Sequence, residues 1–378
     1  MKQKVSKTII ALLILSTFSY MLPLCLSENY TRTYLLLDHP DGTKQYKLNV
    51  VVPQSLYDYY VGQNHKQVSE TDFPKFVTPH ALKPIADKLW EIYRGDYESF
   101  ANGVLMIVHQ IPYQVTVPAK YPVETIVENQ GDCDLFSYVA ASIMKAGGLN
   151  VVLLYYEDKA HMNVGVSLPN PPHYARTQVY YIDYGGSRYY IAECTGGNWR
   201  TGWRVGECPP DLIGENPMVI TLENCEQWSP GQVSASYTTL ISSKLSLTAS
   251  STFVMQGDTI TLFGQLKPNL PNENITIYVK VDNYPWTAHV TTTNPDGKFT
   301  YILRLNEAGT CYIRASWSGN DDYAGTDSPT ITVTVLPVYF VVFSVIVVAL
   351  ACVGVVIFLA SRQKCHEIEI QKLPEISP

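Results

Sequence analysis

Three residues in the middle of the chain have the types that cysteine catalysis requires. Cys133 lies near the start of GDCDLFSYVAASIMKAGG, His161 opens HMNVGVSL, and Glu193 lies in YYIAECTGG. A cysteine nucleophile needs a histidine that moves its proton and a polar group that orients the histidine. The sequence therefore predicts a catalytic set formed by Cys133, His161 and Glu193.

The residues after Cys133 are expected to form a buried helix. Apolar side chains recur at helical spacing after Asp132, a good N-cap residue, and two glycines end the pattern at positions 147 and 148. A thiol in the first turn faces unpaired N–H groups and the positive end of the helix dipole, which favour the thiolate. The alternative is a small buried apolar cysteine. The acidic neighbours Asp132 and Asp134 argue against that alternative.

His161 and Glu193 are expected on neighbouring antiparallel strands. The alternating segments that predict strands cover residues 151–156, 162–168, 179–182 and 189–193, with a hairpin turn at 183–186. Such a sheet can place the imidazole between the thiol and the carboxylate. The alternatives are a strand-end histidine bonded to solvent and an ordinary exposed strand acid.

Further elements are expected on the N-terminal side of Cys133. The sequence predicts a hairpin from segments 34–37 and 46–52, and helices over 81–93 and 97–110. Helices followed by antiparallel strands are typical of an α+β domain. We assign that domain to residues 28–226.

Three strings in one order carry a family resemblance: YPVETIVENQGDCDLFSYVAASIMKAGGL, HMNVGV and YYIAECTGG. They resemble the transglutaminase-like superfamily, whose fold is similar to that of papain-like cysteine proteases, and most of all its microbial and archaeal surface-protein branch. The resemblance implies Cys133 as nucleophile, His161 as general base and acid, and Glu193 as the residue that orients the imidazole. Many members carry Asp in the third position, so Asp183 is the reserve candidate.

The expected reaction is attack of the thiolate on a peptide or side-chain amide. The backbone N–H of Cys133 is one expected donor to the oxyanion, and Gln110 or Gln114 is a candidate for the second. Resolution of the acyl-enzyme by water gives hydrolysis, which we favour, and resolution by an amine gives crosslinking. The alternative is an inactive surface module that binds peptides or envelope partners. Neither hypothesis requires a cofactor or a metal ion.

The two ends of the chain predict export and a membrane anchor. Residues 1–27 combine lysines with an apolar run and are typical of a signal peptide, with an uncleaved signal anchor as the alternative. Residues 338–360 are uncharged and long enough for one transmembrane helix, and Arg362 and Lys364 follow them. We therefore expect an extracellular body on a single-pass anchor, a cytoplasmic tail over 361–378, and a protein or peptide substrate at the cell surface.

Between these parts, the sequence predicts a linker over 227–238 and an immunoglobulin-like β-sandwich over 239–335. The predicted fold class is therefore an α+β transglutaminase-like (papain-like) domain, an all-β immunoglobulin-like sandwich and one C-terminal transmembrane helix. The sandwich resembles domains of prokaryotic, often archaeal, surface proteins.

Composition narrows the partners. The pI of about 5.6 and the absence of a Lys/Arg cluster argue against nucleic acid. No C-x-x-C pair occurs among the eight cysteines, which argues against a zinc ribbon. Disulfide pairing is left open among Cys194, Cys208, Cys225 and Cys311.

Overall fold

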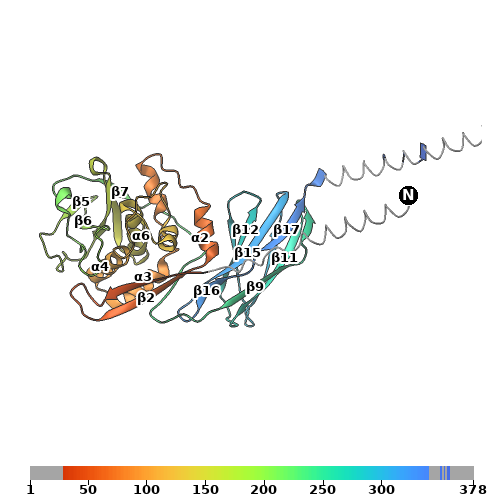
Figure 1. The fold of residues 1–378 in the computed structure, drawn as a ribbon, viewed down its shortest axis with the longest axis horizontal. Coiled ribbons are helices and arrows are strands. Elements are labelled where there is room, and N and C mark those ends of the chain that lie inside the picture. The colour runs from red at the N-terminus through yellow and green to blue at the C-terminus, as the bar shows by residue number, and fades with distance from the viewer. Residues whose placement is uncertain (1–28, 340–349, 351–352, 354–355, 358–378) are drawn as a thin grey trace, which may run out of the picture.

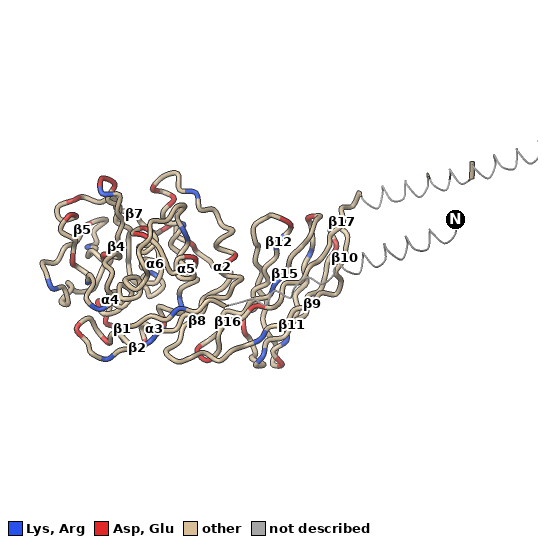
Figure 2. The backbone as a smooth tube through the Cα atoms, viewed as in Figure 1, with Lys and Arg blue, Asp and Glu red and all other residues tan. Residues whose placement is uncertain are grey.

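Two halves with separate hydrophobic cores make up the part of the chain that the structure describes (Figure 1). The computed structural model describes residues 29–339, 350, 353 and 356–357. The core of the first half runs from Tyr34 to Ala235, and that of the second from Leu245 to Val335. Lys and Arg as well as Asp and Glu are scattered over both halves (Figure 2).

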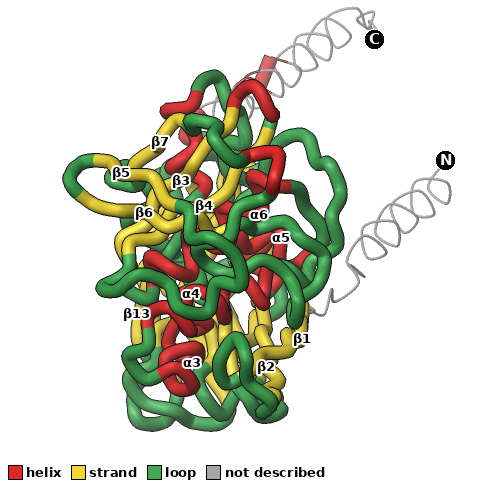
Figure 3. Tube along the Cα trace, turned by 90° about the vertical axis from the view of Figure 1, so that its left-hand side faces the viewer, coloured by secondary structure: helices red, strands yellow, loops and turns green. Residues whose placement is uncertain are grey.

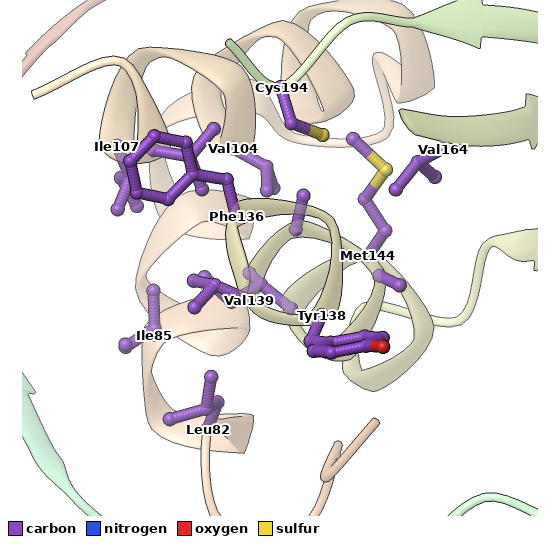
Figure 4. Close-up of a cluster of buried hydrophobic side chains, with 14 of the residues drawn as sticks. Leu82, Ile85, Val104, Ile107, Phe136, Tyr138, Val139, Met144, Val164 and Cys194 are labelled. Atoms are coloured by element: carbon purple, nitrogen blue, oxygen red, sulfur yellow. The ribbon is translucent and has the colours of Figure 1, made fainter. Parts of the chain in front are cut away.

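Helix α6 is the central element of the first half. It packs against α3, α4 and α5 on one side and against strands β3 and β4 on the other. Its residues Leu135 to Met144 are all buried, as the two apolar columns of its sequence require (Figure 4). The α-helices are α2 (Gln54–Val61), α3 (Lys83–Tyr93), α4 (Tyr97–Val108), α5 (Pro122–Glu128) and α6 (Cys133–Ala146), and the 3-10 helices are Glu70–Phe76, Glu157–Lys159 and Pro210–Leu212.

A five-stranded antiparallel sheet in the order β5-β6-β4-β3-β7 lies beside α6 (Figure 3). In its register His161 pairs with Tyr156, and Val164 pairs with Ala192, so His161 and Glu193 emerge near one end of the sheet. The strands are β3 (Asn150–Tyr156), β4 (His161–Ser167), β5 (Tyr181–Tyr184), β6 (Ser187–Ala192) and β7 (Met218–Thr221).

A smaller antiparallel sheet joins β1 (Tyr30–Leu37), β2 (Gln45–Val52) and β8 (Ser234–Ser236). The predicted N-terminal hairpin is confirmed by the pairing of β1 with β2. Strand β8 falls inside the predicted linker 227–238 and pairs with β2. This part of the segment therefore belongs to the fold of the first half.

The second half consists of two facing sheets around one core. One has the order β10-β17-β15-β12-β13, with β16 paired to β15, and the other has the order β14-β11-β9. The strands are β9 (Lys244–Ala249), β10 (Phe253–Met255), β11 (Thr259–Lys267), β12 (Asn274–Val281), β13 (Thr287–Thr292), β14 (Lys298–Arg304), β15 (Gly309–Gly319), β16 (Ala324–Asp327) and β17 (Ile331–Leu336).

Polar contacts connect the two halves around α2. The carboxylate of Asp327 accepts a hydrogen bond from the backbone N–H of Ser55 at 2.7 Å. Arg314, which is 5% exposed, forms an ion pair of 2.6 Å with Asp58 on the same helix. The start of α2 is therefore held by a residue of the sandwich rather than by a cap from its own half.

The fold-class prediction is wrong as a whole. Of the described residues, 35% lie in strands and 23% in helices, so the structure is mostly β and does not match an α+β domain followed by a sandwich and a membrane helix. The helical patterns between residues 81 and 146 are local, and the strands of the four sheets contain more residues than the helices do.

The predicted fold class also included one C-terminal transmembrane helix. Within the described residues, no helix combines the length and the apolar character that a membrane crossing needs. Most of the predicted span 338–360, and all of the predicted signal peptide 1–27 and tail 361–378, lie outside the described residues.

Candidate active site

Cys133 is the first residue of α6 and is half-buried. Its Sγ atom lies 3.9 Å from the carbonyl oxygen of Ala160. The first intrahelical hydrogen bond is donated by Phe136 to Asp132, at 2.9 Å, so the helix does not use the N–H group of Cys133. This N–H is therefore free to stabilise an oxyanion formed on a carbonyl attacked by the sulfur.

His161 reaches the site because a tight turn joins β3 to β4. Ala160, the residue before His161, has a left-handed backbone with φ of 46° and closes the 3-10 turn Glu157–Lys159. The Nε2 atom of His161 donates a hydrogen bond of 2.9 Å to Oε2 of Glu193. The side chain of Cys133 also acts on the imidazole and raises its pKa, and Nδ1 is the ring nitrogen that Glu193 leaves open.

Glu193 follows β6 directly and is fully buried. Its Oε2 atom accepts from His161 and, at 3.2 Å, from Nδ2 of Asn163. Its Oε1 atom accepts from the backbone N–H of Thr195 at 2.8 Å and from the Thr195 hydroxyl at 2.6 Å. Only an ionised carboxylate can accept on both oxygens from four donors, so this environment selects the charged form.

The pKa values of His161 and Glu193 are shifted in opposite directions. Burial alone would lower the pKa of His161, but its hydrogen bonds to Cys133 and Glu193 outweigh burial and raise it to about 10. Burial alone would raise the pKa of Glu193, but the hydrogen bonds from His161 and Thr195 lower it overall. At neutral pH the site therefore holds an imidazolium between a carboxylate and a sulfur atom.

Two aspartates flank Cys133 and contact each other. Asp132 does not cap α6 with its side chain; its Oδ2 accepts instead from the backbone N–H of Thr116 at 2.7 Å. Burial, together with a hydrogen bond to Asp132 and the negative charge of Asp132, raises the pKa of Asp134 to about 8. Since two adjacent negative carboxylates repel each other, Asp134 keeps its proton at neutral pH.

Two further predicted residues lie elsewhere. The amide oxygen of Gln110 accepts from the N–H of Leu35 at 2.8 Å and its amide nitrogen donates to the carbonyl of Leu35 at 2.9 Å, so this side chain connects the end of α4 to β1. Asp183 lies on β5 with its side chain 62% exposed, and it pairs with Arg188 at 3.0 Å. The structure thus brings Cys133, His161 and Glu193 together and leaves Gln110 and Asp183 outside the site.

The cysteines of residues 29–339 are all free thiols. Cys194, next to Glu193, points into the buried cluster with Met144 and Val164 (Figure 4). Burial raises the pKa of Cys194 and of Cys225, and raises that of Cys208 and of Cys311 to about 11. Cys133 is the accessible thiol of the described chain.

Comparisons with known proteins do not assign the chain to a family. No protein-family model matches the chain, and no curated protein matches it. Weak likenesses occur to a chitin-binding domain from Burkholderia pseudomallei (11% identity, 23% of this chain, 57% of that chain, TM-score 0.20), a β-glucosidase from Erythrobacter marinus (12%, 26%, 16%, 0.18) and the adhesin InvE of Yersinia pseudotuberculosis (13%, 46%, 53%, 0.19). The aligned parts cover between 16% and 57% of those chains. Likenesses this weak carry no argument about fold or function.

Sequence reasoning missed three residues that hold Glu193 in place. Asn163 and Thr195 lie two residues after His161 and Glu193, and this spacing within strand-like segments could have indicated them. His109 is different, because its buried Nε2 atom bonds the carbonyl oxygen of Glu193 at 3.0 Å across 84 positions. Burial lowers the pKa of His109, so the ring is neutral and donates this bond.

No group of three or more His, Cys, Asp or Glu side chains between residues 29 and 339 is arranged to hold a metal ion. The groups around Cys133 are of the types that can move a proton and stabilise an oxyanion.

Proposed function

We propose that this protein is a cysteine hydrolase that cleaves peptide or side-chain amide bonds. The observation that carries the proposal is the buried carboxylate of Glu193, which accepts from four donors and holds the imidazole of His161 beside Cys133. A site whose role was only structural would have no need for a charged, oriented imidazole next to an accessible thiol. The order of the three sequence motifs, which resembles transglutaminase-like enzymes, also supports it.

The reaction follows from the charges of the site. The Cys133 sulfur attacks the amide carbon, and the backbone N–H of Cys133 stabilises the oxyanion. His161 gives the proton on Nδ1 to the departing amine as the C–N bond breaks, which leaves a thioester. Water then attacks the thioester while Nδ1 takes one of its protons, and the C–S bond breaks to release the acid and restore the starting charges.

Glu193 positions the ring throughout this cycle. Its negative charge stabilises the imidazolium before the first step and after the last, and its bond to Nε2 fixes which nitrogen faces the sulfur. We also propose that the enzyme works outside the cell, because residues 1–27 have the pattern of a signal peptide.

Alkylation of the full-length chain by iodoacetamide tests the proposal. We expect Cys133 to react faster than every other thiol and to stay reactive below pH 7, since the imidazolium of His161 faces it over that range. His161→Ala should abolish the reactivity of Cys133 at acid pH, and Cys133→Ser should remove the fastest-labelled position. Labelling of Cys133 only after denaturation, or at a rate that ignores His161, would overturn the proposal in favour of an inactive binding module.

A further inference from the structure

The segment from Tyr113 to Val117 exposes three apolar side chains beside the active site. Tyr113, Val115 and Val117 are 60%, 72% and 90% exposed. They are spaced two residues apart, which puts side chains of an extended chain on one side. The segment contains no charged residue. We call Tyr113–Val117 the apolar edge.

Hydrogen bonds fix the apolar edge to the residues immediately before the nucleophile. Tyr113 forms a parallel bridge with Gly131, in which the N–H of Gln114 donates to the Gly131 carbonyl at 2.6 Å. The N–H of Thr116 donates to Asp132 at 2.7 Å. The ring of Tyr113 also contacts Phe136, one turn into α6. An amide bound at Cys133 must therefore lie next to this edge.

The outer backbone of the apolar edge is unpaired. The bridge to Gly131 uses the carbonyl of Pro112 and the N–H of Gln114, so the N–H and carbonyl of Tyr113 face the opposite side. Within the described residues, neither these groups nor the backbone groups of Val115 have a protein partner. Such an edge can add an extended peptide as a new strand.

We propose that the apolar edge binds the substrate as an extended peptide with apolar side chains flanking the scissile amide. This inference rests on the function proposed above and specifies its substrate class. The unpaired N–H and carbonyl groups align the peptide backbone, while Tyr113, Val115 and Val117 cover its apolar side chains. The absence of charge on the edge makes acidic and basic peptides the poorer ligands.

Protection of Cys133 from iodoacetamide tests the inference in the full-length protein. The probes are two end-capped decapeptides, one alternating Leu with Thr and one with every Leu replaced by Asp. For each protein variant, the readout is the ratio of the Cys133 labelling rates without and with peptide. We expect the Leu peptide to slow labelling at least tenfold at saturation and the Asp peptide to leave it unchanged, since apolar contacts discriminate by roughly 10–200-fold.

Variants and a modified peptide separate the parts of the inference. Val115→Asp should reduce the protection ratio about tenfold, whereas Ile302→Asp, at a site 69% exposed on the sandwich, should keep it. If Val115→Asp does not fold, Val117→Thr serves in its place and should weaken protection several-fold. A Leu peptide N-methylated at alternate residues should lose protection, because it cannot pair with the edge.

The outcomes distinguish this inference from the proposed function. If labelling of Cys133 depends on His161 but both peptides protect equally, or neither protects, the apolar edge is not the substrate site while the proposed function stands. Full protection by the N-methylated peptide would overturn the strand pairing. Labelling that ignores His161 would overturn the proposed function, and the inference with it.

Discussion

At the scale of single residues, the decisive arrangement is the carboxylate of Glu193 with its four donors. Each oxygen accepts twice, from His161 and Asn163 on one side and from Thr195 on the other. Burial without these donors would strongly destabilise the charged carboxylate. The pKa of Glu193 is lowered overall because the hydrogen bonds it accepts outweigh the effect of burial. The orientation of the His161 imidazole and the stability of the fold therefore depend on the same group.

Glu193→Gln tests this dependence. An amide keeps the shape but has only one acceptor oxygen, so two of the four donors meet an NH₂ group. We expect the unfolding free energy to fall by about 3–5 kcal/mol at pH 7, as for breaking a buried ion pair, and Cys133 labelling below pH 7 to slow. Denaturant titration and iodoacetamide kinetics measure the two effects.

The loss of unfolding free energy caused by Glu193→Gln should become smaller as the pH falls. Because the folded pKa of Glu193 is lowered, its contribution is present above the ordinary carboxyl pKa and is lost as the pH falls through the folded value. The difference between the two proteins should therefore shrink in acid. Asp183→Asn, which removes an exposed pair, is the matched control and should cost at most about 1 kcal/mol. An equal loss in both variants would contradict the assignment.

At the scale of elements, the start of α6 carries the accessible thiol of Cys133 between two neighbouring acids, Asp132 and Asp134. The N-terminal end of a helix stabilises negative charge, yet Asp134 keeps its proton to about pH 8 because it is partly buried beside Asp132. Asp132, the residue before Cys133, connects the helix to the apolar edge by accepting from the N–H of Thr116. Loss of that proton places a second negative charge at this junction.

Because Asp134 is protonated in the folded protein at neutral pH, we expect the stability of the fold to depend on pH. Its folded pKa is raised, so its contribution is fully present below the ordinary carboxyl pKa and is lost as the pH rises through about 8. We expect Asp134→Asn to be the more stable protein at pH 9, by roughly 1–3 kcal/mol, with the gap narrowing towards pH 4. Denaturant titrations across pH measure it. Asp87→Asn on α3, whose side chain is 55% exposed, is the matched control for the substitution itself.

The elements also show which parts of the structure the sequence can specify. Apolar spacing predicted α3, α4, α6 and the hairpin of β1 and β2 to within a few residues, because these patterns are local. Strand β8 has three residues and exists only by pairing with β2, so no local pattern could reveal it. His109 likewise acts through a contact formed by the tertiary fold.

The error in fold class has the same origin. Periodicity identifies each element separately, but the balance of helix and strand and the number of sheets depend on how all of them pair. Gln110, a candidate for the second oxyanion donor, has its amide engaged with the backbone of Leu35, a contact that no local pattern could reveal.

At the scale of the whole molecule, the sandwich supports α2 of the first half. Asp327 bonds the N–H of Ser55, and Arg314 is held between Asp58 and the ring of Trp286, 5.0 Å away. A buried guanidinium that loses its carboxylate partner is costly, so the two halves should unfold together.

Arg314→Met tests this coupling. The variant keeps an apolar chain in the core of the contact but removes the ion pair with Asp58. We expect the wild-type protein to unfold in one calorimetric transition and the variant in two, with the coupling weakened by roughly 1–3 kcal/mol. Arg304→Met, on the exposed face of β14, is the control and should keep one transition. One transition in both variants would show that the ion pair does not couple the halves.

The free thiols between residues 29 and 339 have a consequence for handling the protein under reducing and oxidising conditions. Without a disulfide in this part of the chain, dithiothreitol has no covalent crosslink there to break, and it should keep Cys133 reduced without lowering the melting temperature. Among the thiols between residues 29 and 339, brief hydrogen peroxide should instead form a sulfenic acid at Cys133 first, since the other four of that range are buried. Loss of Cys133 labelling after peroxide, and its recovery with reductant, would report on this oxidation.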